Sequence, residues 1–213
     1  METKIEEFNN ALCDVRKAYR LIYSYQSRML DLAYFIKSKL DFPSFLGFKH
    51  YSEPIVQKRN GELRIWNNMW AWDFLYSYMF EYDFENVLME NGEEYGLSII
   101  QYSDTGFFES NGIDRLDIDS FAKEDESGSK LLFILEVKPK KKEWIWNIEE
   151  LIYNKEYATM QHTRSVLNSE KGNIQILYSF PLDRFLNEQT SIDALEEFIN
   201  FCHENNIMEL SII

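Results

Sequence analysis

The sequence predicts a mixed α/β domain preceded by a long N-terminal helix. Residues 5–40 repeat apolar side chains at helical spacing, whereas several later segments alternate apolar and polar residues as strands do. Apolar residues make up 45% of the chain and aromatic residues 16%, which is enough to fill a sizeable core. We therefore expect residues 1–42 to form a long helix or helical hairpin, and residues 43–213 to form one α/β core domain.

The N-terminal segment has the most regular pattern. Its apolar positions are spaced alternately three and four residues apart, with a polar interruption at Gln26: Ile5, Phe8, Leu12, Val15, Tyr19, Ile22, Met29, Ala33, Ile36 and Leu40. This is the heptad spacing of helices that pack along one seam. Two structures stay open, a coiled-coil helix that joins a homodimer and a long helix or hairpin packed on the protein's own body. A second apolar stripe widens the face and favours the latter.

The remaining elements are separated by turn signals such as Asn60-Gly61, Asn91-Gly92 and Asn111-Gly112. A run without Gly or Pro, apolar on nearly every side, predicts a buried helix over residues 66–84. The other predicted elements are strands over 95–102, 115–122, 131–138 and 173–180, helices over 145–167 and 191–205, and a short last strand over 208–213. We expect Thr190 and Asp193 to cap the last helix.

Charge is distributed unevenly along the chain. The net charge is −14, and residues 61–130 hold sixteen acidic but only four basic side chains. An acidic chain is an awkward nucleic-acid binder, because affinity for phosphate comes largely from Lys and Arg. The densest basic cluster, Lys140, Lys141 and Lys142, directly follows the strand predicted over 131–138 and could bind phosphate. No apolar run reaches the ~20 residues of a membrane helix, and no signal peptide is apparent, so we expect a cytoplasmic protein with no membrane association.

Acidic residues and a lysine stand two apart on the central predicted strands. Because strand side chains alternate faces, Glu136 and Lys138 share one face, and so do Asp117 and Asp119 on the preceding predicted strand. If these strands pair through the turn at 124–130, the carboxylates can meet. Such an oxygen cluster suits Mg²⁺ or Mn²⁺, and the lysine would stabilise charge on a phosphate under attack. The alternative is a surface ion pair at a strand end, with both aspartates solvated.

This pattern resembles the metal-binding hairpin of PD-(D/E)xK nucleases, in which an Asp near one strand precedes a turn and an apolar strand ending in Glu-x-Lys. Here Asp119-Ser-Phe-Ala is followed by Leu-Leu-Phe-Ile-Leu-Glu136-Val-Lys138. The element order over residues 66–180 is similar to the family core of helix, three-stranded meander, helix and strand. The resemblance implies a restriction-endonuclease-like three-layer core with a central mixed sheet flanked by helices. It also implies that Glu136 and either Asp119 or Asp117 are metal ligands, with Asp119 favoured, and that Lys138 is catalytic.

Further residues follow from the same resemblance. The first core helix of the family often adds an acid, for which Glu81 and Asp73 are candidates. The helix after the Glu-x-Lys strand often contributes a polar residue, for which the candidates are Tyr157, Gln161, Lys155 and, more weakly, His162. The sequence departs from the family pattern in one respect, since no Pro precedes either Asp.

Two functions follow as expectations. The first is a Mg²⁺- or Mn²⁺-dependent endo- or exonuclease that hydrolyses phosphodiester bonds, with DNA as the expected substrate, in repair, restriction or defence. The second is a catalytically inactive nuclease-like fold whose acidic middle region binds a basic protein, as an immunity protein or inhibitor does.

Overall fold

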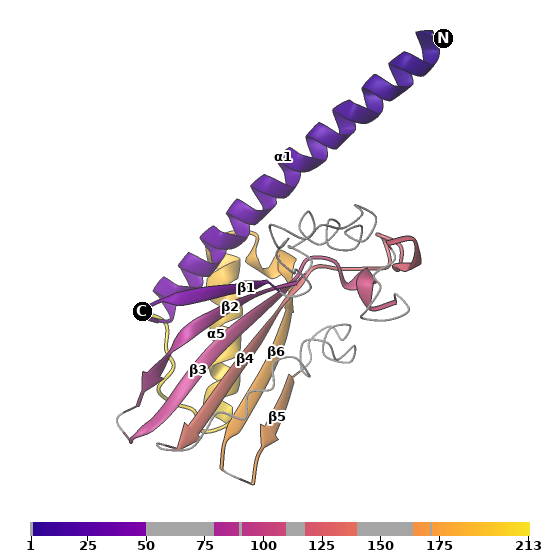
Figure 1. Cartoon of the computed structure of the whole chain (residues 1–213). Coiled ribbons are helices and arrows are strands. Elements are labelled where there is room, and N and C mark those ends of the chain that lie inside the picture. Colours follow the sequence, from indigo (N-terminus) through magenta and orange to yellow (C-terminus); the bar gives the residue numbers. More distant parts are fainter. Residues whose placement is uncertain (1, 50–78, 90, 110–117, 140–163, 171) are drawn as a thin grey trace, which may run out of the picture.

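The computed structural model describes residues 2–49, 79–89, 91–109, 118–139, 164–170 and 172–213, which contain a six-stranded sheet and two α-helices (Figure 1). The elements are, in chain order, α1 (Glu2–Lys39), β1 (Phe45–Lys49), β2 (Met79–Leu88), β3 (Glu93–Tyr102), η2 (Thr105–Glu109), η3 (Ile118–Ser120), β4 (Lys130–Pro139), β5 (Arg164–Asn168), β6 (Ile174–Pro181), η4 (Leu182–Phe185) and α5 (Glu188–Glu204). The elements labelled η are short 3₁₀-helices. The predicted mixed α/β class is confirmed. No helix in these ranges is long and apolar enough to span a membrane.

The strands lie in the order β1-β2-β3-β4-β6-β5, and every neighbouring pair is antiparallel. Strands β2, β3 and β4 form a meander. A hairpin joins β5 to β6, and β6 pairs with β4 on its other side. The expectation of a mixed sheet is therefore wrong for the described strands. A parallel pair needs a crossover connection, whereas β6 enters the sheet through a tight hairpin turn.

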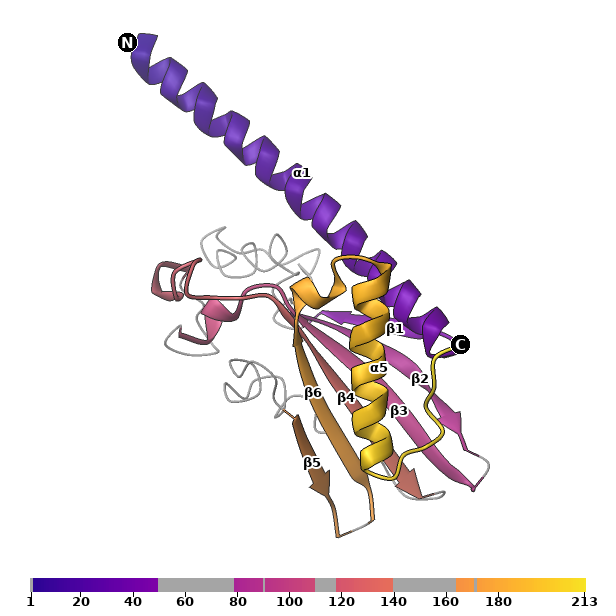
Figure 2. The same cartoon turned by 180° about the vertical axis from the view of Figure 1, so that it is seen from behind.

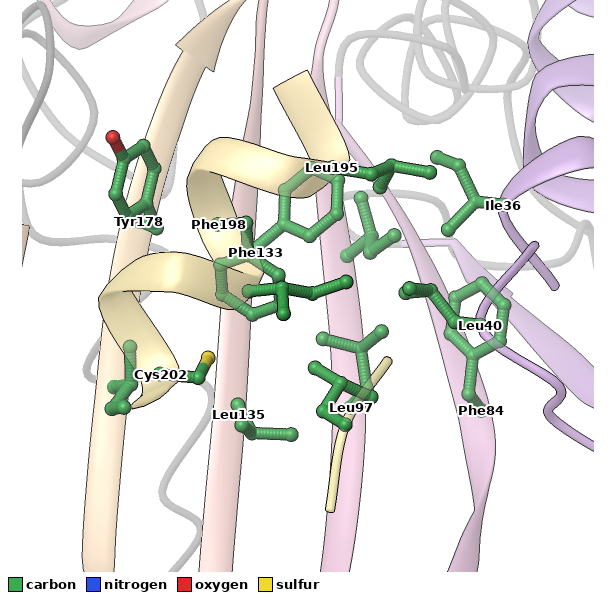
Figure 3. Packing of buried hydrophobic residues seen from close by; sticks show 14 of the residues in the cluster. Ile36, Leu40, Phe84, Leu97, Phe133, Leu135, Tyr178, Leu195, Phe198 and Cys202 are labelled. Atoms are coloured by element: carbon green, nitrogen blue, oxygen red, sulfur yellow. The ribbon is translucent and has the colours of Figure 1, made fainter. Parts of the chain in front are cut away.

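Helices α1 and α5 both pack on one face of the sheet, which we call the helix face (Figure 2). Phe133 and Leu135 of β4 meet Leu195 and Phe198 of α5 there, and Ile36 of α1 packs beside them (Figure 3). Each such buried side chain contributes about 1.5–3 kcal/mol relative to exposure. The opposite face carries a smaller apolar cluster near one end of the strands: Met79, Ile100, Tyr102, Phe107, Leu132, Ile134 and Leu177.

Helix α1 is continuous, so the hairpin alternative is wrong. Its last turns belong to the main core, since Met29, Ala33, Ile36 and Leu40 are all buried. Its first turns project away from the sheet (Figure 1). There the same heptad positions are exposed, from 38% at Leu12 to 64% at Phe8.

The helix predicted over residues 66–84 is wrong at its C-terminal end, because residues 79–84 begin strand β2. In β2 the aromatic rings of Phe80, Tyr82 and Phe84 pack toward the helix face, and Glu81 and Asp83 alternate with them. Aromatic residues favour a pleated, half-buried surface, and this alternation was hidden within a longer apolar run. Residues 66–78 lie outside the described ranges.

Other boundaries also differ from the sequence predictions. Residues 164–167, predicted as helix, form most of β5, where Val166 packs on the helix face. Helix α5 begins at Glu188 rather than residue 191, because Asn187 and Thr190 form its capping box instead of Thr190 and Asp193. Residues 208–213 do not form a strand. The Ile213 N–H instead donates to the Lys39 carbonyl at 3.0 Å, which attaches the C-terminal segment to the end of α1.

Candidate functional site

Strand β4 places Glu136 and Lys138 on the face opposite the helices. Leu135 and Val137 pack on the helix face, so the intervening residues project from the other side. Glu136 is 0% exposed and Lys138 is 5% exposed. The alternative of a surface ion pair differs from the structure in burial, since both groups lie within a central strand that has neighbours on either side, although Asp119 is exposed as that alternative expected.

Each of these buried charges has a partner on a neighbouring strand. The amide of Asn173, immediately before β6, donates from Nδ2 to Glu136 Oε1 at 2.7 Å, and Asn173 itself is fully buried. The Lys138 ammonium forms an ion pair with the carboxylate of Glu94, which stands directly opposite it on β3. Such pairing is required, because an unpaired buried charge costs several kcal/mol.

The surroundings of Glu136 are polar and small. Gly96 of β3 and Gln175 of β6 are its direct cross-strand neighbours. Since strand side chains alternate, Glu94, Gly96 and Ser98 occupy successive positions on this face of β3. Gly96 contributes no side chain, so β3 itself places no side chain directly opposite Glu136.

Two more carboxylates, Glu81 and Asp83 of β2, lie on the same face of the sheet as Glu136. Ser98 Oγ donates to Glu81 Oε1 at 2.7 Å, which joins β3 to the buried Glu81. Burial, reinforced by the nearby charge of Glu81, raises the pKa of Asp83 to about 6. We call the four carboxylates Glu81, Asp83, Glu94 and Glu136 the acidic face.

Asp119 is not part of this group. It is exposed and lies in η3, in the connection that joins the Tyr102 end of β3 to the Lys130 end of β4. Glu136 lies six residues further along β4, roughly 20 Å at about 3.3 Å per residue. The predicted pairing of residues 115–122 with β4 is therefore wrong over the described residues 118–122, because β4 pairs with β3 and β6. The structure separates Asp119 from Glu136.

The remaining predicted site residues fall in two groups. Glu81 lies on strand β2 rather than on a helix, yet it shares the face of Glu136. The others lie outside the described ranges: Asp73, Asp117, Lys140, Lys141, Lys142, Lys155, Tyr157, Gln161 and His162. Within the ranges that are described, no three acidic, histidine or cysteine side chains are grouped to hold a metal ion. These residues alone therefore do not complete a metal site.

Sequence reasoning missed Glu94, Asn173 and Asp83. The signal for Glu94 was available, because residues 94, 96 and 98 alternate with apolar residues just after the Asn91-Gly92 turn. Asn173 lay inside the predicted strand, but nothing in the sequence paired it with Glu136. That contact depends on β6 being the neighbour of β4.

Comparison with known proteins gives one match. A family model described as PM0109 matches residues 5–207, almost the whole chain. That description carries no statement of activity. No curated protein and no solved structure matches.

Proposed function

The chain belongs to the PM0109 family, whose description names no activity, and we propose from its buried charged residues that it is a nuclease of the PD-(D/E)xK kind that hydrolyses phosphodiester bonds, with DNA as its substrate. The observation that carries the proposal is the burial of Glu136 and Lys138 side by side on one face of the central strand. Charged groups are rarely buried for stability alone, because hydrophobic replacements are often as stable. Perturbed and paired charges cluster at functional sites.

The order of elements supports a restriction-endonuclease-like core, although the described sheet is antiparallel and not mixed. Strands β2, β3 and β4 form an antiparallel meander, and the Glu-x-Lys pair stands on its third strand, as in the nuclease family. Strand β6 then packs beside that third strand and α5 covers the helix face. The meander starts one strand earlier than the sequence suggested, since β2 takes the place of the C-terminal end of the first core helix, predicted over residues 66–84.

The described residues have separable roles in this proposal. Glu136, oriented by Asn173, supplies a carboxylate opposite Gly96 of β3. Lys138, held by Glu94, supplies positive charge that stabilises a phosphate under attack. A Mg²⁺ or Mn²⁺ ion, when bound, would polarise the phosphodiester and activate water.

A cleavage assay tests the proposal. We expect supercoiled and linear DNA to be cut when Mg²⁺ or Mn²⁺ is present, and single-stranded DNA and RNA serve as competing substrates. Glu136→Gln keeps the shape and the Asn173 contact but removes the charge, so it should lower the rate by at least about a hundredfold. Lys138→Met should do the same. Glu196 is an exposed acid on α5, on the other side of the sheet from Glu136. The Glu196→Gln variant is the matched control and should cut DNA at the wild-type rate.

Two outcomes contradict the proposal. Undiminished cleavage by both Glu136→Gln and Lys138→Met places the activity elsewhere. If the wild-type protein shows no cleavage, and its Tm does not rise when a divalent ion is added, metal-dependent activity is excluded. An ion that binds only the folded state must stabilise that state.

A second function is favoured by a different observation. Asp119 lies far from Glu136, and the turn Glu124-Asp125-Glu126 is exposed. We therefore also propose, as the alternative, that the fold binds a basic protein through its acidic surface without catalysis. Binding to a defined basic polypeptide, such as polylysine, should weaken steeply with salt. The triple variant Glu124→Gln/Asp125→Asn/Glu126→Gln should weaken it further. Equal binding by this variant contradicts a role for the turn.

A further inference from the structure

The exposed part of α1 continues a surface that is already an interface in this protein. Its heptad positions from Met29 to Leu40 are buried against the sheet. The same positions from Ile5 to Tyr19 are between 38% and 64% exposed, although they carry side chains of the same apolar kind. A helix face that is apolar along its whole length but covered along only half of it calls for a second occupant.

We propose that this occupant is the same segment of a second copy, and that the two α1 helices pair in an antiparallel coiled coil centred between Cys13 and Asp14. Heptad positions then meet in layers whose residue numbers add to 27. Leu12 lies opposite Val15 of the second copy, Phe8 opposite Tyr19, and Ile5 opposite Ile22. Each layer joins two apolar side chains.

The body of the protein decides the orientation. From Met29 onward the heptad face of α1 is occupied by the sheet. A parallel second helix would run into this occupied face, and the two bodies would compete for the space between the helices. An antiparallel helix instead has its residue 2 opposite Tyr25, so it ends just before the sheet begins. The exposed stretch of heptad positions on one α1 is therefore as long as the N-terminal segment of the second α1 that would cover it.

Charge also favours the antiparallel orientation. Residues 2–14 of α1 hold four carboxylates and one lysine, whereas residues 15–28 hold four basic side chains and no acid. Antiparallel pairing sets each acidic half beside a basic half. Parallel pairing sets like charges side by side, within the Debye length of about 8–10 Å at physiological salt.

A cavity lies where the end of the second helix would arrive. It has a volume of about 550 Å³ and is lined by Tyr25, Arg28 and Met29 of α1 together with Phe185 and Leu186 after β6. The Arg28 guanidinium donates to the Leu186 carbonyl at 2.6 Å, which ties the cavity wall to α1. Residues 2–4 of the second copy reach this level. The cavity therefore marks the position along α1 at which the second helix would end.

Sedimentation of the full-length protein tests the pairing. We expect the mass to rise from monomer to dimer over roughly a hundredfold range of concentration. Leu12→Glu places a charge in the central layer, which is solvent-exposed in the monomer, so the chain still folds but the Kd rises at least about tenfold. Asn10→Glu adds the same charge to the same half of the helix, on its outer face, and should dimerise as the wild type does. A concentration-independent monomer, or equal dimerisation of the two variants, overturns the proposal.

Spin-label distances test the orientation. Cys13 is partly exposed, whereas Cys202 is buried and its burial raises the thiol pKa to about 12, so label reacts at Cys13. Labels at Cys13 should be close to one another in the dimer. In a Cys13→Ser background, Ser24→Cys labels should be separated by about 30 Å along the axis. Ser24 of one copy lies level with residue 3 of the other, and the helix rises about 1.5 Å per residue. A short Ser24→Cys distance overturns the antiparallel arrangement. Neither experiment depends on nuclease activity, so the dimer and the nuclease proposal are tested separately.

Discussion

The carboxylates of the acidic face differ in what surrounds them. Glu136 faces a neutral amide, Asn173, that donates to it at 2.7 Å. Asp83 instead is partly buried and lies near another carboxylate, Glu81. Burial and the neighbouring negative charge both disfavour its ionisation, so the pKa of Asp83 rises to about 6 from the ordinary 3.8.

This difference makes Asp83 a source of pH-dependent stability. Between about pH 4 and pH 6 the folded state holds a proton at Asp83 that the unfolded state has lost, so the free energy of unfolding falls as pH rises through that window. Above it the ionised carboxylate remains destabilising. Asp83→Asn should therefore raise stability at pH 8 by about 1 kcal/mol, a value reduced because the side chain is partly exposed, and have little effect at pH 4.

Thermal unfolding at the two pH values measures this effect. Asp125→Asn, in an exposed turn, removes one negative charge without touching the sheet and is the matched control. A gain in Tm for Asp83→Asn that is equal at pH 4 and pH 8, or larger at pH 4, contradicts the assignment.

Among the elements, α5 shows how a local signal fixes a helix start. The Asn187 side chain accepts from the Thr190 N–H at 3.1 Å, and the Thr190 hydroxyl accepts from the Asn187 N–H at 3.2 Å. The pair satisfies two backbone donors at the exposed end of the helix. Its buried stripe then presents Ala194, Leu195 and Phe198 to the sheet.

Removal of this cap should destabilise the protein. Asn187→Ala should lower the free energy of unfolding by about 1 kcal/mol, because one backbone donor loses its acceptor. Asn200→Ala, an exposed position within the same helix, makes the same change of residue without a cap and should not destabilise. Urea unfolding measures both. An equal loss in the two variants would mean that the cap contributes nothing beyond composition.

For the whole molecule, the core on the helix face joins elements from both ends of the chain. The Phe133 ring lies 5.5 Å from Phe180, 5.1 Å from Phe198 and 6.0 Å from Phe185, measured between ring centroids. It thus connects the centre of the sheet to α5 and to η4. Helix α1 reaches the same core through its last turns.

Truncation of this ring should therefore weaken the whole fold. Phe133→Ala should cost about 3–5 kcal/mol, the usual range for an aromatic removed from a rigid core. Tyr23→Ala, at a position on α1 that is 74% exposed, is the control and should change stability by less than about 0.5 kcal/mol. Calorimetry distinguishes the two. If Phe133→Ala unfolds within about 1 kcal/mol of the wild type, the ring is not a central part of the core.

The sequence alone determined the elements whose pattern is strong and local. Alternation predicted the strand that became β4, and heptad spacing predicted α1, because a side chain's face follows directly from the backbone repeat. The same alternation placed Glu136 and Lys138 together, and the structure confirms that they share a face.

Only the tertiary structure decided which strands are neighbours. Pairing depends on residues far apart in the chain, and local pattern carries no information about it. Residues 118–122, predicted to pair with β4, do not belong to the sheet, whereas β3 and β6 pair with β4, and Glu94 and Asn173 supply the partners of Lys138 and Glu136. For the same reason the heptads of α1 could not reveal that one half packs on the sheet. The periodicity is continuous, and only the position of the body divides the buried half from the exposed one.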